Sequence, residues 1–267
     1  MAAISSNLRV FRRYGRTLSI LAVILLLAQG AAMVCGARWG LVFKGMWSST
    51  TFLVKLLRPD FSAFADMLKP ALDSIFIALV GTLVGTVFSL FFALLAASNI
   101  APRWLRQSVR FLLGMERALP EIVILLFLVA AFGLGSFAGV VALAIGCVGM
   151  LGKLIADAIE ELDPVSIEAI QAIGANRIQV IVFGVIQPII PSIISLSLFR
   201  FEYCIRLSVV LGAVGAGGIG LELYRSFVIL DYGRAASALV VTLALVFLSE
   251  QMSGWLRKKI KGEGRLQ

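Results

Sequence analysis

Two glycine patterns in this sequence match loops that bind nucleotides in other proteins. The stretch Gly215–Gly220 fits G-x-G-x-x-G, which binds dinucleotides where a strand precedes it and a helix follows. Here an apolar stretch interrupted by charges precedes it. Gly152-Lys153 matches the end of a phosphate-binding loop, but Leu154 replaces the Ser or Thr that would hold magnesium. We therefore expect no ATP or dinucleotide site in this chain.

The residue types that most hydrolytic and metal-dependent reactions need are missing or scattered. The sequence contains no His, which excludes Ser-His-Asp catalysis and His-ligated metal sites. Cys35, Cys147 and Cys204 lie far apart in apolar runs, a placement typical of small membrane residues rather than of a disulfide framework. We expect no catalytic residue, no bound metal or cofactor, and no enzymatic activity of this chain alone.

The composition is that of a membrane protein. Hydrophobic residues make up 60% of the chain, charged residues only 15%, and the mean hydropathy is +0.99. A soluble domain is normally about a quarter charged, so these values indicate an integral membrane protein. The net charge of +9 can indicate nucleic-acid binding. Most basic residues flank apolar runs, however, so we interpret the charge as membrane orientation and expect no nucleic-acid partner.

The apolar runs predict an all-α integral membrane protein with six transmembrane helices and both termini in the cytoplasm. A basic tail precedes the first run, which we expect to be a retained helix, with a cleaved signal peptide as the alternative. Residues 36–70 are expected to form an external segment at the membrane interface, and Pro70 to open the second span. The predicted spans are residues 18–35, 71–97, 109–132, 138–157, 188–211 and 233–255.

The same runs divide the chain into three parts. Residues 1–70 hold the cytoplasmic tail, the first helix and the external segment; residues 71–256 form the transmembrane domain; residues 257–267 form a basic cytoplasmic tail. Within the domain, Gly81-Thr82 and Gly85-Thr86 place small residues four apart, which predicts close helix packing. We expect the glycine-rich stretch Gly212–Gly220 to be flexible and external.

Charged residues interrupt the third and fifth predicted spans. Pro120 lies between Glu116-Arg117 and Glu121 and is expected to bend or break the helix, because it cannot donate to the carbonyl of Glu116. Charges in such a position should face the bundle interior. Arg117 could pair with either glutamate, or these residues could line a pathway. Both roles are also open for the three charges of the fifth span, Arg200, Glu202 and Arg206, of which Arg200 and Glu202 could pair.

The longest moderately polar stretch of the C-terminal half lies between two apolar segments, from Asp163 to Pro191. Its Glu-Ala start, a glycine six residues after the glutamate, and closing prolines predict a short amphipathic helix, a turn and a return to the membrane. A helix of this kind at a membrane surface is a contact point for another protein.

This stretch resembles the cytoplasmic loop of bacterial ABC importer permeases, whose signature reads E-A-A, three residues, G, then nine residues and I-x-L-P. Glu168-Ala169 and Gly174 match at the right spacing, whereas Gly184 stands where Ile is expected and Pro188 comes one place late.

A wider similarity, to permeases of phosphonate (PhnE-type) ABC transporters, covers about residue 70 to the C-terminus. Some members of that family carry His where this chain has Gly146. The similarity is carried by Ala118–Glu121, Gly133–Gly135, Phe137–Gly139, Gly149–Leu154, Glu160-Glu161, Asp163-Pro164, Gly174-Ala175, Arg177, Gln179–Ile181, Gly184-Val185, Pro191, Arg200, Glu202, Arg206, Val214–Gly220 and Asp231-Tyr232.

The resemblance implies a type I ABC importer permease fold with a cytoplasmic coupling helix around Ser166–Gln179. It implies that Glu168, Ala169, Gly174, Ala175 and Arg177 take part in coupling to an ATPase. Arg117, Arg200, Arg206 and Glu202 become candidates for the anion pathway, and Pro120, Gly217 and Gly218 for helix breaks or gating.

The implied partners are a pair of ABC ATPase subunits that use ATP and Mg, a second permease copy, a periplasmic substrate-binding protein and membrane lipid. The implied location is the bacterial inner membrane. The implied substrate is phosphonate or a related phosphorus oxyanion such as phosphite, hypophosphite or phosphate. Two alternatives stay open: a sister importer for methionine, nitrate, sulfonate or glycine betaine, and an ion-coupled secondary transporter.

Overall fold

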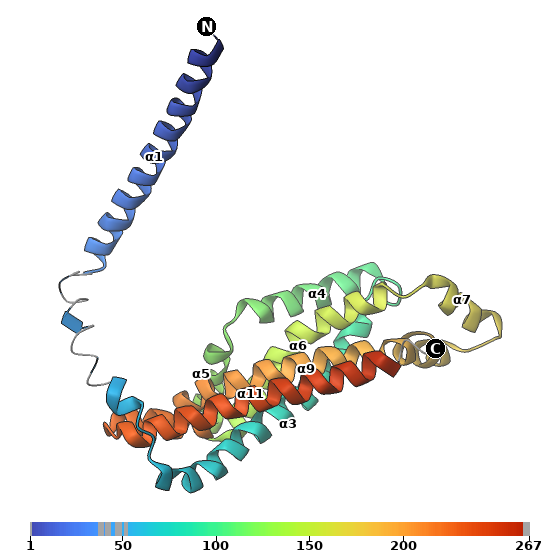
Figure 1. Ribbon diagram of the computed structural model, residues 1–267. Coiled ribbons are helices and arrows are strands. Elements are labelled where there is room, and N and C mark those ends of the chain that lie inside the picture. The colour runs from blue at the N-terminus through green and yellow to red at the C-terminus, as the bar shows by residue number, and fades with distance from the viewer. Residues whose placement is uncertain (1, 37–39, 41–43, 46–49, 51–52, 264–267) are drawn as a thin grey trace. The chain divides into compact units, whose positions relative to one another are not determined.

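The computed structural model describes residues 2–36, 40, 44–45, 50 and 53–263, and the regular elements of this part of the chain are helices (Figure 1). They fall into two units, residues 1–55 and 56–267. The first unit contains α1, Ala2–Val34, whose apolar part Thr17–Val34 is long enough to cross a membrane. Part of the expected interfacial segment 36–70, including Trp39 and Trp47, and the end of the basic tail lie outside the described residues.

The second unit begins with a capped turn rather than at Pro70. Asp60 caps η1, Phe61–Ala63, by accepting a hydrogen bond from the Ser62 backbone, and the Ser62 hydroxyl and amide together lower the pKa of Asp60. Helix α3 then runs from Phe64 to Ala96 with Pro70 inside its second turn. The prediction that Pro70 opens the span was therefore wrong. A proline this near a helix N-terminus removes only one backbone hydrogen bond.

Helices α3 and α6, Ser136–Glu160, form the centre of the unit. Gly81 and Gly85 face α6 so closely that a Cβ on Gly81 would lie 2.8 Å from Cβ of Leu143, and one on Gly85 would overlap Cβ of Cys147. This confirms the close packing predicted from small residues four apart.

The third predicted span, 109–132, is two helices and not one. Helix α4, Arg103–Ala118, ends before Pro120, which caps α5, Glu121–Phe132. The break at Pro120 is confirmed, and the continuous span is not. Helix α5 has 12 residues and a length of about 18 Å, which is less than the roughly 30 Å of a bilayer core.

The remaining membrane helices extend beyond their predicted bounds. The fifth continues from α8, Arg177–Gln179, through the π-helical turn η2, Val180–Ile186, into α9, Gln187–Leu211. The sixth is α11, Tyr232–Glu263. Five helices of the described chain, α1 included, are long and apolar enough to span a membrane, and α5 is a shorter apolar helix.

The glycine-rich stretch, expected to be a flexible external segment, consists of helical turns packed closely against neighbouring backbone. The π-helical turn η3, Gly212–Ala216, and Gly217-Gly218 lead into α10, Ile219–Val228, a helix that the sequence reading missed. A Cβ on Gly220 would overlap the carbonyl of Val209, and one on Gly212 would overlap that of Gly217. Glycine is required because the backbone segments touch directly.

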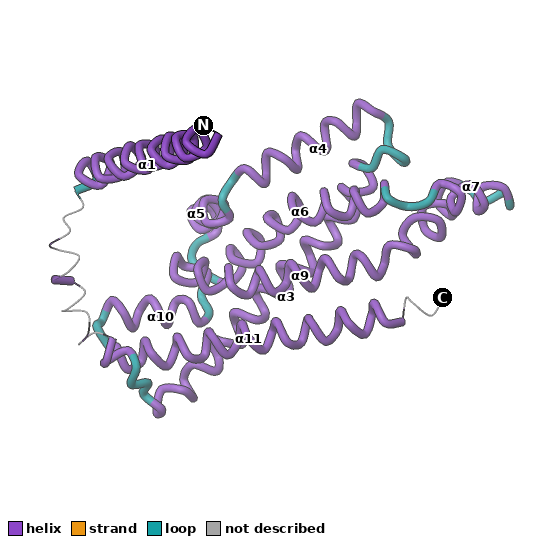
Figure 2. The backbone as a smooth tube through the Cα atoms, turned by 45° about the horizontal axis from the view of Figure 1, so that its top comes forward, coloured by secondary structure: helices purple, strands orange, loops and turns teal. Residues whose placement is uncertain are grey.

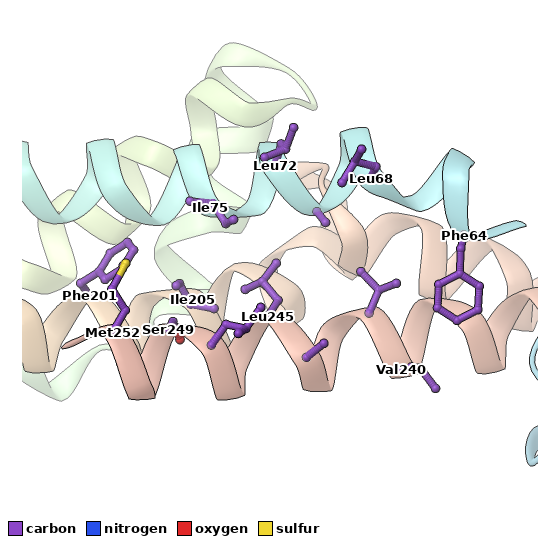
Figure 3. A pocket seen from close by; sticks show the side chains of 14 residues that line it. Phe64, Leu68, Leu72, Ile75, Phe201, Ile205, Val240, Leu245, Ser249 and Met252 are labelled. Atoms are coloured by element: carbon purple, nitrogen blue, oxygen red, sulfur yellow. The ribbon is translucent and has the colours of Figure 1, made fainter. Parts of the chain in front are cut away.

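Helices α3 and α11 also border an apolar groove of about 420 Å³ with α9 at its base (Figure 3). Its side chains are hydrocarbon except for the hydroxyl of Ser249 and the sulfur of Met252. Such a lining suits a surface that faces lipid.

The elements that matter for function lie at opposite ends of this unit. Helix α7, Pro164–Ala172, lies at one end, and α10 with the start of α11 lies at the other (Figure 2).

Candidate functional site: an exposed helical segment and a buried charge cluster

Helix α7 is a short, well-capped helix outside the bundle. Asp163 accepts a hydrogen bond of 3.0 Å from the Val165 backbone, and Pro164 occupies the first helical position, where its missing N–H costs nothing. Glu168 and Ala169 are both exposed on this helix. The sequence therefore places a carboxylate on a preformed helix that is open to a partner.

The turn after α7 is fixed by glycine and by a second cap. Gly174 has φ of +85°, in the left-handed region that glycine enters without strain. Asn176 and Gln179 then form a capping box through bonds of 2.9 and 2.8 Å. Ala175 is half-buried within this turn, and Arg177 is exposed at the start of α8.

Helix α7 packs at Gly184 against the membrane helix that follows. A Cβ at Gly184 would lie 3.3 Å from Cδ1 of Ile170 and 3.9 Å from Cα of Ile167, so the absence of a side chain lets α7 approach η2. A cleft of about 450 Å³ separates the remaining part of α7 from the turn before α4; its lining residues are Asn99, Ile100, Ile167, Gln171, Ala175, Arg177, Val180, Ile181 and Val185.

A π-helical turn lies just before Pro188, the residue that departs from the loop signature. In η2 the amide of Gln187 donates to the carbonyl of Val182, five residues earlier, whereas an α-helical amide reaches back four. The turn therefore holds one residue more than an α-helix of the same length. Pro188, which comes one place later than in the signature, follows this turn.

In the membrane part of the unit, Arg200 of α9 is buried, and each of its three guanidinium nitrogens has a partner. Its Nη2 donates to Oε1 of Glu121 at 3.2 Å, and its other nitrogens lie 3.3 Å from the sulfurs of Cys147 and Met150. The guanidinium carbon lies 4.7 Å from the ring centroid of Tyr203, a favourable cation–π geometry. The arginine thus joins α5, α6 and α9.

The sequence did not predict that Cys147 and Gly146 would lie beside this arginine. The sulfurs of Cys147 and Cys204 lie 3.7 Å apart, although the residues are distant in sequence. A Cβ on Gly146 would lie 2.9 Å from Nη2 of Arg200 and from Cγ of Glu121. The space beside Gly146 is therefore filled by the ion pair that α5 and α9 contribute.

Glu116 lies near this cluster with one oxygen unsatisfied. Its Oε2 is buried without a hydrogen-bond partner among the described residues, and a Cβ on Gly149 would overlap it. Gly149 of α6 therefore makes room for the carboxyl group of α4.

The charge pairs that form are not the ones that the sequence left open. Glu121 pairs with Arg200 and not with Arg117, which is exposed. Glu202 pairs with Arg257 and not with Arg200, and Arg206 pairs with Glu250. Arg200 and Arg206 have partners on different helices because six residues of α9 place them about 120° apart around its axis. Arg200 faces α5 and α6, while Glu202 and Arg206 bind α11.

Of the predicted break residues, Gly217 and Gly218 lie where α9 and α10 meet. Their φ angles are +85° and +72°. Ile219 donates its amide to Oγ of Ser74 at 2.9 Å, and Gly135 donates to the carbonyl of Gly215. The break is thereby anchored to α3 and to the turn before α6. A gating role for these glycines and for Pro120 stays a prediction.

Comparisons with known proteins agree with this architecture. Residues 85–262 match the family model described as binding-protein-dependent transport system inner membrane component. The phosphite transport system permease protein PtxC of Stutzerimonas stutzeri is 37% identical over 94% of this chain and 90% of its own length. The putative phosphite permease HtxC of the same organism is 34% identical over 88% of this chain and 84% of its own.

A solved structure shares the fold. The methionine ABC transporter MetNI in an inward-facing form contains a chain that aligns with a TM-score of 0.67 at 20% identity, covering 75% of this chain and 99% of that one. The helical order, the exposed segment after α6 and the family match lead to one conclusion: this chain belongs to the family of binding-protein-dependent transport system inner membrane components.

Proposed function

We propose that this chain is the permease subunit of an ATP-driven importer for phosphite, phosphonate or a related phosphorus oxyanion. The observation that carries the proposal is the similarity to a phosphite permease, which extends over 94% of this chain and not over the coupling segment alone. The protein acts in a bacterial inner membrane, with α7 and both termini on the cytoplasmic side.

Energy for transport comes from a pair of ATPase subunits that bind ATP and Mg and contact α7. Glu168 is exposed at the contact, and the packing of Ile170 on Gly184 makes α7 and the start of α9 move together. A short rigid helix transmits a rigid-body displacement. ATPase closure is thereby passed to α9 and to the breaks at its far end.

The pathway forms with a second copy of the permease. The donors of Arg200 are occupied by Glu121 and by sulfur, so we assign Arg200 a structural part in this conformation. Arg117 is exposed beside the break at Pro120 and is the better candidate to meet an anion. Arg206 and Glu202 fix α9 to α11 through their partners.

Substrate class is tested by uptake. Cells that express the complete transport system should accumulate labelled phosphite or phosphonate, and a strain that lacks only this permease should not. Competition by unlabelled sulfonate or methionine should leave this uptake unchanged. Accumulation of sulfonate or methionine without any phosphorus oxyanion would disprove the substrate assignment and support a sister importer.

Reversing the charge at Glu168 tests the coupling contact. Glu168→Lys should reduce uptake about tenfold or more, since an unfavourable charge at an interface costs several kcal/mol and 1.4 kcal/mol is a factor of ten. The ATPase should also fail to copurify. Glu161→Lys, an exposed carboxylate at the end of α6, is the matched control and should retain both properties. Unchanged copurification of the Glu168 variant would contradict the contact.

A further inference from the structure

Helix α6 carries a lysine that none of the ion pairs described above uses. Lys153 is exposed in the last third of α6 and has no ion-pair partner among the described residues. The carboxylate one turn later, Asp157, is bound instead by Arg110 of α4 at 3.5 Å. Ionisable side chains inside membrane helices are costly, and they line substrate pathways or bind partners. An unpaired lysine on this helix therefore needs an explanation.

Lys153 lies on the face of α6 that the neighbouring helices leave open. On one side of this face, Gly152 packs so closely against α4 that a Cβ would lie 3.2 Å from the side chain of Leu113. On the other side, Cys147 contacts α9. Seven residues, or nearly two full turns, separate Lys153 from Gly146, which faces the ion pair between α5 and α9. The lysine therefore points between α4 and α9, below that ion pair.

A second exposed cation lies one helical turn away on the same side of α6. Gly149 precedes Lys153 by four residues, which is about 6 Å along the helix axis. The side chain of Arg117 lies against it, because a Cβ on Gly149 would be 3.1 Å from Cγ of Arg117. The carboxyl group of Glu116 also lies at Gly149. One carboxylate against two cations leaves this strip of α6 with a net positive charge.

The step from Arg117 to Lys153 leads toward the α7 end of the unit, because α6 runs in that direction (Figure 2). A cleft of about 460 Å³ begins at Leu154, next to the lysine, and Ser192 and Ser195 of α9 line its other side. Serine hydroxyls can donate hydrogen bonds to an anion. Several weak contacts in succession let an ion enter a pathway and also leave it, whereas one strong site would retain it.

We propose that Lys153 is an anion-contacting residue of the transport pathway, which receives the phosphorus oxyanion from Arg117 before the anion leaves on the ATPase side. The inference rests on the proposed function, which supplies the substrate class and the direction. The ammonium group has three donors on a flexible stem, so it can follow a tetrahedral oxyanion without fixing it. The lysine of the Gly152-Lys153 pair, which is not part of a nucleotide site, thereby has a role.

A charge series at Lys153 tests this contact. Proteoliposomes with the complete transporter, ATP inside and the binding protein outside are given labelled phosphite or phosphonate. Lys153→Arg should keep the maximal uptake rate, Lys153→Gln should lower it about tenfold, and Lys153→Glu should lower it further, because the contact is electrostatic. The KM should change little, since the binding protein captures the anion first. Lys258→Gln, an exposed lysine near the end of α11, is the matched control and should transport normally.

Stability and ATPase binding separate this role from other uses of the lysine. The unfolding temperature and ATPase copurification of every variant should match the wild type, because an exposed, unpaired charge contributes little to folding. Normal uptake by Lys153→Gln would overturn the proposal. So would an Arg variant as defective as the Gln variant, or loss of the ATPase from the Gln variant. If the wild type itself accumulates no phosphorus oxyanion, the proposed function fails, whatever the variants do.

Discussion

Glu121→Gln is expected to destabilise the protein by about 3–5 kcal/mol, because it leaves a buried guanidinium without its counter-ion. The side chain of Arg200 is 3% exposed and that of Glu121 22%, so solvent can compensate little of the loss. The remaining partners of the arginine are two sulfurs and a tyrosine ring, which accept weakly. Thermal or denaturant unfolding of the purified variant measures the effect.

Removing both charges should restore most of the stability. In the double variant Glu121→Gln with Arg200→Met no unpaired charge is left, and an apolar replacement of a buried pair is often close to neutral. The matched control is Arg206→Met, whose pair with Glu250 is 49% and 41% exposed and should contribute less than about 1 kcal/mol. A double variant as unstable as the single one would contradict a pairwise role.

The same variants test whether Arg200 has a structural role or acts on the substrate in the transport pathway. If the arginine only joins α5, α6 and α9, uptake should return with stability in the double variant. If uptake stays lost while the protein is stable and binds its ATPase, Arg200 acts on the substrate, and the structural assignment is wrong.

The second large effect is expected at the contact of α3 with α6. Gly85→Ala should destabilise by about 1–3 kcal/mol, as overpacking of a close-packed interior does. The added methyl group would overlap Cβ of Cys147 and would lie 2.8 Å from the carbonyl oxygen of Ala144. Neither atom belongs to a flexible side chain, so the helices must separate.

Gly114→Ala is the matched control for this contact. A Cβ on Gly114 of α4 would meet nothing within 4 Å, so alanine should stabilise the helix by up to about 1 kcal/mol. The two substitutions add the same atoms and should have opposite signs in an unfolding experiment. Equal effects would mean that α3 and α6 do not rely on their glycines.

Features that depend on residues close together in the sequence could be predicted from it. The break at Pro120 follows from a missing amide, and the approach at Gly81 and Gly85 follows from their spacing. The start of α7 at Asp163-Pro164 likewise has a local cause in its cap. The apolar runs did not predict the full length of α3 and α11. Polar residues at the end of a membrane helix lower the local mean hydropathy without ending the helix.

The charge pairs could not be predicted, because they depend on the rotation of whole helices. Glu121 and Arg200 are 79 residues apart, and a helix turned by one residue, about 100°, would offer each a different partner. Helix α10 was missed for another reason. Its ten residues follow a glycine-rich stretch that locally favours a loop, and the packing of Gly212 and Gly220 against distant backbone has no local sequence signal.

The π-helical turn η2 also bears on where the length of this membrane helix can vary among related chains. An insertion in the middle of a membrane helix normally rotates every later side chain, and here it would have moved Arg200 away from Glu121. A residue added within the π-helical turn η2 would be taken up as a local widening, and the downstream face of α9 would keep its orientation. Alignments of this chain with relatives of regular signature spacing should therefore place their single-residue gap within Val180–Ile186, where an added residue would leave the helix contacts beyond it unchanged.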